Sequence, residues 1–175
     1  MRVCLHRASI FGFLATMLLA INYFEISETP ALAAENFGQE LSGKWTYRSF
    51  HNNPALVTDD DKTALSIFFA EATFTFNVGA DSLLTGALDW QGGGLDLQGT
   101  IEPGGPAGPL TVQIVGTGRP GTQTENWEYD YFGYLAHSWP NGVAQVPALV
   151  GSVLRAKPHN GAPAGYAASF IAVKQ

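Results

Sequence analysis

The sequence predicts an all-β protein, an antiparallel up-and-down barrel of eight strands. Short runs in which apolar and polar residues alternate recur along the chain, and clusters of glycine and proline separate them. This alternation is typical of strands with one buried face, and short turns between such strands favour a meander. Closing the meander into a barrel removes exposed strand edges. A two-sheet β-sandwich fits the same pattern and stays an alternative.

The strands are expected wherever the period-two alternation is clear. In one run, Leu95, Leu97 and Ile101 alternate with Asp96 and Gln98, so the apolar side chains share one face. The expected strands are approximately 43–50, 71–78, 83–90, 94–101, 110–117, 126–136, 148–156 and 165–173.

One segment between the first two strands does not alternate. Asp59, Asp60 and Asp61 precede a run with apolar residues at helical spacing. Acidic residues stabilise the N-terminus of a helix, and aspartate is a favoured N-cap. We therefore expect one short helix near 60–69.

The N-terminal segment, residues 1–33, has the pattern of a secretory signal peptide. Arg2 and Arg7 form a positive region, an apolar stretch follows over 8–21, and residues 31–33 read Ala-Leu-Ala. The sequence predicts cleavage after residue 33 and a single barrel domain over 34–175. The protein is thus expected to be exported, to the periplasm or the extracellular space.

Charge and cysteine content exclude several classes of function. The net charge of −6 argues against a nucleic-acid partner. The one cysteine, Cys4, lies in the predicted leader, which leaves the mature chain without disulfides or thiolate chemistry. The histidines at 51, 137 and 159 have no zinc-binding spacing. We expect no metal, no cofactor and no stable membrane insertion; the oligomeric state stays open.

Gly43-Lys44-Trp45 stands at the start of the first expected strand. A Gly-x-Trp there, followed by an eight-strand meander, resembles the calycin group, the lipocalins and avidin-like proteins. In those families the tryptophan packs across one end of the barrel. The resemblance implies an interior able to hold a small ligand, and it implies no particular ligand.

The strand at 126–136 is unusually rich in aromatic residues. Alternation places Trp127, Tyr129 and Tyr131 on one face and acidic residues, including Asp130, on the other. An inward aromatic face would offer a ligand a stacking surface, whereas an inward acidic face would bury carboxylates capable of acid–base chemistry. The candidate ligand contacts are Trp45, Tyr129, Tyr131 and Trp139, the last in an expected loop.

Four charged residues are candidates for the barrel interior. Glu71 and Asp130 would be the acids, and Arg48 and Arg155 could pair with them. The leading hypothesis is an exported soluble barrel that binds a small molecule. An enzyme of cyclase or isomerase type, using these interior carboxylates, is the main alternative, and a small outer-membrane barrel is a further one.

Overall fold

The computed structural model describes most of the chain beyond the predicted leader. The described residues are 38, 40–53, 55–56, 59–104, 108–136 and 143–175. The signal-peptide prediction for 1–33 and the candidate contact Trp139 lie outside these residues.

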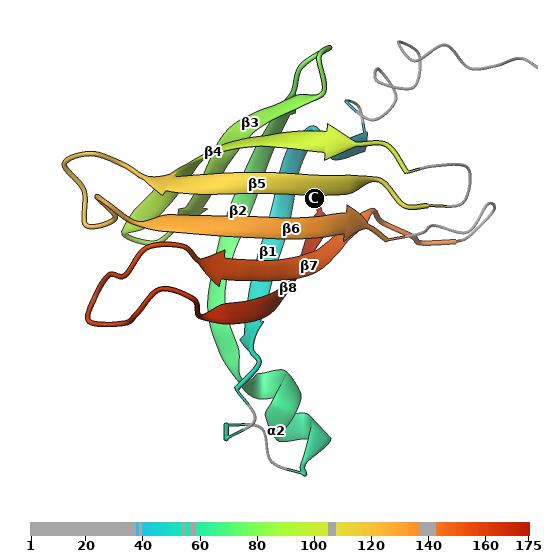
Figure 1. Ribbon diagram of the computed structural model, residues 1–175. Coiled ribbons are helices and arrows are strands. Elements are labelled where there is room, and N and C mark those ends of the chain that lie inside the picture. Colours follow the sequence, from blue (N-terminus) through green and yellow to red (C-terminus); the bar gives the residue numbers. More distant parts are fainter. Residues whose placement is uncertain (1–37, 39, 54, 57–58, 105–107, 137–142) are drawn as a thin grey trace, which may run out of the picture.

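The described residues form a closed, all-antiparallel barrel of eight strands, in which each strand pairs with the next and β8 pairs with β1 (Figure 1). The strands are β1 (Gly43–His51), β2 (Phe68–Val78), β3 (Leu83–Trp90), β4 (Gly93–Glu102), β5 (Thr111–Gly118), β6 (Glu128–Leu135), β7 (Ala148–Arg155) and β8 (Ala167–Lys174). The up-and-down barrel prediction is confirmed, and the strands do not divide into the two sheets of a sandwich.

The strand pleat sorts side chains between the interior and the outer surface. On β4, Leu95, Leu97 and Ile101 are buried, whereas Asp96 and Gln98 are exposed. This sorting follows directly from the alternation in the sequence, because successive side chains of a strand point to opposite faces.

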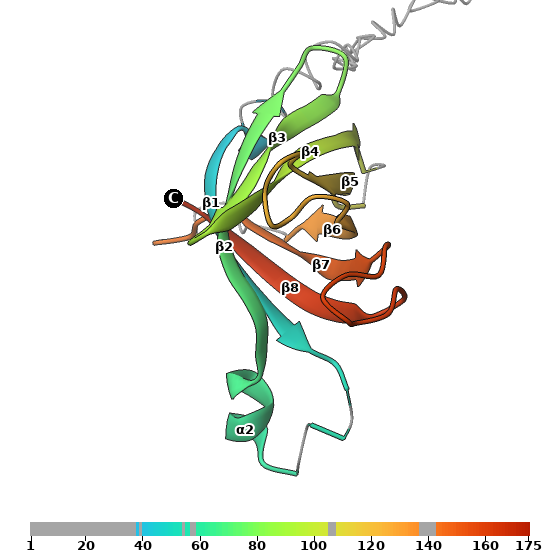
Figure 2. The same ribbon diagram turned by 90° about the vertical axis from the view of Figure 1, so that its left-hand side faces the viewer.

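The expected helix near 60–69 is present but shorter. Helix α2 (Asp61–Ser66) starts at Asp60, whose side chain accepts a hydrogen bond from the Lys62 backbone at 3.1 Å. It ends at Ile67 because β2 begins at the next residue and Phe68 pairs with Phe50 of β1. The hairpin of β1 and β2 extends beyond the barrel and carries α2 at its tip (Figure 2). No helix in the described part of the chain is long and apolar enough to cross a bilayer.

Trp45 closes one end of the barrel. Its side chain is fully buried, and its indole nitrogen donates a hydrogen bond to the Leu41 carbonyl at 2.9 Å. Its ring lies 6.2 Å from that of Phe76, and the Lys174 ammonium lies 5.8 Å from its centroid. The chain segment before β1 therefore acts as a plug for this end.

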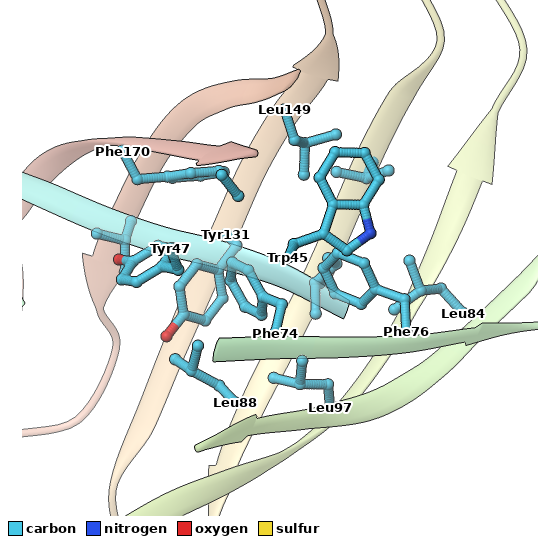
Figure 3. Packing of buried hydrophobic residues seen from close by; sticks show 14 of the residues in the cluster. Trp45, Tyr47, Phe74, Phe76, Leu84, Leu88, Leu97, Tyr131, Leu149 and Phe170 are labelled. Carbon is cyan, nitrogen blue, oxygen red and sulfur yellow. The ribbon is translucent and has the colours of Figure 1, made fainter. Parts of the chain in front are cut away.

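Aromatic rings fill the middle of the barrel (Figure 3). Phe74 is fully buried and contacts the rings of Tyr47, Phe76 and Tyr131 at centroid distances of 4.8, 4.8 and 5.5 Å. Burial raises the pKa of the Tyr131 phenol well above its usual value, so this hydroxyl stays protonated. Packed side chains therefore fill the barrel from the Trp45 end to its middle.

Candidate functional site

A cavity of about 430 Å³ lies at the end of the barrel opposite Trp45. The odd-numbered strands end and the even-numbered strands begin at this end, which places Trp90, Trp127 and Arg155 close together. Tyr47 and Tyr131, from the packed middle of the barrel, contribute to the lining of the cavity. The cavity therefore begins where the aromatic core stops.

Three flat rings stack along one wall of the cavity. The Trp90 and Trp127 rings are 6.2 Å apart and 17° from parallel. His159, from the loop between β7 and β8, stacks on Trp127 at 4.1 Å and 17°. Trp127 is the middle ring, with Trp90 and His159 as its stacked neighbours, so a ligand in the cavity meets this stack at its edge or at its outer rings.

The His159 ring is held in one orientation by two hydrogen bonds. Its Nδ1 lies 3.0 Å from the Lys157 carbonyl oxygen, which can only accept, so Nδ1 carries the hydrogen. Its Nε2 then accepts from the Tyr129 hydroxyl at 2.9 Å. Burial, together with the positive charge of Arg155, lowers the pKa of His159 below its usual value. The lowered pKa favours the neutral imidazole, in which Nδ1 donates and Nε2 accepts.

Arg155 supplies the positive charge of the cavity. Its Nε donates to the Tyr129 hydroxyl at 3.4 Å, and Nη1 donates to the Pro163 carbonyl at 3.3 Å. The guanidinium carbon lies 5.9 Å from the Phe69 ring centroid and 5.7 Å from that of Tyr166. These contacts fix the guanidinium at the cavity without neutralising it.

The candidate ligand contacts divide between the two ends of the barrel. Tyr129 and Tyr131 line the cavity, as does Arg155. Trp45 is at the plugged end and has no part in the cavity lining. The strand at 126–136 turns its aromatic face inward, so the first of the two orientations considered for it is the observed one.

Three of the four charged residues predicted as candidates for the interior point outward instead. Arg48 and Glu71 form an ion pair on the outer surface, where their side chains are 50% and 51% exposed. Arg48 lies between the inward-facing Trp45 and Tyr47, and the pleat turns it outward. The sequence suggested that such an arginine could pair with an acid inside the barrel, whereas this pair lies outside it.

Asp130 also lies on the outer face of β6, because Tyr129 and Tyr131 on either side of it face inward. Partial burial, and then the negative charge of Glu128 on the same face, raise the pKa of the Asp130 carboxyl. This carboxylate does not reach the cavity.

Phe69, Trp90 and His159 are among the cavity residues that sequence reasoning missed. Phe69 was assigned to the helix. Trp90 was the last residue of an expected strand, and the sequence did not indicate whether its side chain faces inward or outward. His159 lies in a loop rich in glycine and proline, where no periodicity indicates direction. Only the clustering of aromatic residues at strand ends could have pointed to Trp90 and Trp127.

Fold and site together define the class of protein: a closed antiparallel β-barrel, plugged at one end, with an aromatic cavity at the other. No protein-family model, no curated protein and no solved structure matches the chain. The likeness to calycins therefore rests on Gly43-Lys44-Trp45 and the strand order alone.

Proposed function

We propose that this protein binds a small, flat, largely apolar molecule in the cavity at the Trp127 end of the barrel. The observation that carries the proposal is the cavity itself. Its volume of about 430 Å³ is in the range of small-molecule sites, roughly 300–1,000 Å³. Its wall is aromatic, with few polar groups, which is the usual composition of such sites.

Binding is favoured over catalysis because of where the carboxylates lie. The enzyme alternative depended on Glu71 or Asp130 as interior acid or base. Glu71 contributes to the cavity lining, but its carboxylate pairs with Arg48 on the outer surface, and Asp130 lies on the outer face of β6. Among the polar residues that line the cavity, Arg155, Tyr129 and His159 are bonded to one another or to backbone carbonyls. Polar groups held in this way can fix the orientation of a bound ligand. The predicted leader supports a site of action outside the cytoplasm.

The most direct test removes the centre of the aromatic wall. Trp127→Ala deletes the central ring of the wall, and we expect it to weaken binding about 10- to 100-fold, since an aromatic contact of this size contributes on the order of 1–3 kcal/mol. Native mass spectrometry of the protein with a panel of small aromatic and aliphatic acids, alcohols and amides identifies ligands. Isothermal titration calorimetry then measures the affinity of each variant.

Phe132→Ala is the matched control. This aromatic residue lies on the outer face of β6 and is 48% exposed, so its loss leaves the cavity intact. We expect unchanged affinity. Equal losses in both variants, or a panel from which the wild-type protein retains nothing, would contradict the proposed function.

A further inference from the structure

Arg155 is a positive charge at an apolar cavity, and no carboxylate in the described part of the chain pairs with it. The other arginines that meet acids do so elsewhere: Arg48 pairs with Glu71, and Arg119 with Asp89 and Asp96, all on the outer surface. Glu128, close in sequence to Tyr129, pairs with Lys157. The acids that could neutralise Arg155 are thus engaged with other cations or face away from the cavity.

The groups around Arg155 hold its guanidinium in place, but none of those described below carries a negative charge. Two neutral oxygens, of Tyr129 and Pro163, accept from Nε and Nη1. The rings of Phe69 and Tyr166 flank it. A guanidinium has five N–H donors arranged to meet two oxygens at once, and a carboxylate is the group that this geometry fits best.

Arg155 also acts on its neighbour at the cavity. His159 has its pKa lowered mainly by burial and further by the charge of Arg155, so it stays neutral and adds no second cation. Tyr129 bonds both residues, and all three side chains line the same cavity as Trp127. The polar side of the cavity thus places one positive charge next to an aromatic wall.

We propose that the ligand is a small carboxylic acid with a flat apolar body, whose body lies in the cavity along the aromatic wall of Trp90, Trp127 and His159 and whose carboxylate pairs with Arg155. This inference rests on the proposed function and specifies the chemistry of its ligand. The acid supplies the negative charge that the described chain does not place beside Arg155.

A pair of probes that differ only in charge tests the inference. 2-Naphthoate and 2-naphthamide have the same flat body, but only the first is anionic at neutral pH. We expect the wild-type protein to bind 2-naphthoate about 10- to 100-fold more tightly than the amide, as hydrogen bonds to charged groups allow. Added salt should weaken binding of the acid more than binding of the amide.

Arg155→Gln should remove the preference for the acid while leaving the affinity for 2-naphthamide nearly unchanged. Arg48→Gln is the control, since it removes the same charge from the outer surface of the same barrel, and we expect it to keep the preference. If Arg155→Gln does not fold, Arg155→Lys serves, because it keeps the charge and loses the two-pronged geometry. Arg155→Lys should reduce, but not abolish, the preference for 2-naphthoate over 2-naphthamide.

The outcomes separate the two proposals. Equal affinity of the wild-type protein for both probes, or equal loss of the preference in the Arg155 and Arg48 variants, overturns the carboxylate inference and leaves the binding cavity standing. Failure of the wild-type protein to bind either probe counts against the cavity as a site for flat apolar molecules, and therefore against both proposals.

Discussion

Phe74→Ala is expected to lower the free energy of unfolding by about 3–5 kcal/mol, the usual cost of truncating a fully buried phenylalanine. The ring of Phe74 contacts rings on three other strands, those of Tyr47, Tyr131 and Phe170. Its loss would open a void at the centre of the barrel, and the surrounding strands cannot collapse into it while they remain hydrogen-bonded in a closed ring. Chemical denaturation followed by circular dichroism measures the change.

Phe132→Ala provides the comparison for Phe74→Ala. It removes the same atoms from the outer surface, where the side chain is half exposed, and we expect a change within about 1 kcal/mol. Similar losses for the two variants would mean that the interior is not packed as described.

Gly151→Ala is expected to destabilise the barrel by about 3 kcal/mol or more, although it adds a single methyl group. Gly151 on β7 faces the interior beside Gly133 on β6. A Cβ at Gly151 would lie 1.9 Å from the Phe132 carbonyl oxygen and 2.6 Å from the Gly133 Cα. Both are backbone atoms, so no change of rotamer relieves the overlap, and the two strands must separate. Thermal and chemical denaturation both report the loss.

Gly38→Ala is the control for this variant, because a Cβ there would meet its nearest atom, on Val78, at 3.8 Å, an ordinary contact distance. We expect a change within about 1 kcal/mol. A Gly151→Ala protein as stable as the Gly38→Ala protein would contradict the close approach of β6 and β7.

The fold could be predicted from the sequence because the barrel depends on a local signal. In each strand the alternation of apolar and polar residues indicates which face is buried, as for Leu95, Leu97 and Ile101 of β4. The short Gly-rich turns indicate that successive strands are neighbours. The start of β2 was missed because Phe68 and Phe69 continue the apolar spacing of α2. A β-bulge beside Phe50 also shifts the pairing of the two strands there.

The site could be predicted only in part, because its members meet in space and not in sequence. Tyr129 and Tyr131 were found from one strand. Arg155 was a candidate from its strand, whereas His159 lies in the loop after β7, whose direction no periodicity indicates. Arg48 and Glu71 were candidates for the interior, Glu71 because it lies among apolar residues. The parity of their strands turns both outward, where water screens their charges.

Nuclear magnetic resonance of the tryptophan indole N–H signals tests the central claim that the cavity at the Trp127 end is the binding site. Trp90 and Trp127 line the cavity, whereas Trp45 is buried at the plugged end and bonded to Leu41. Titration with 2-naphthoate should shift the signals of Trp90 and Trp127 together and to saturation, and leave that of Trp45 in place. Signals of Trp90 and Trp127 that do not move, or a saturable shift confined to Trp45, would contradict the account.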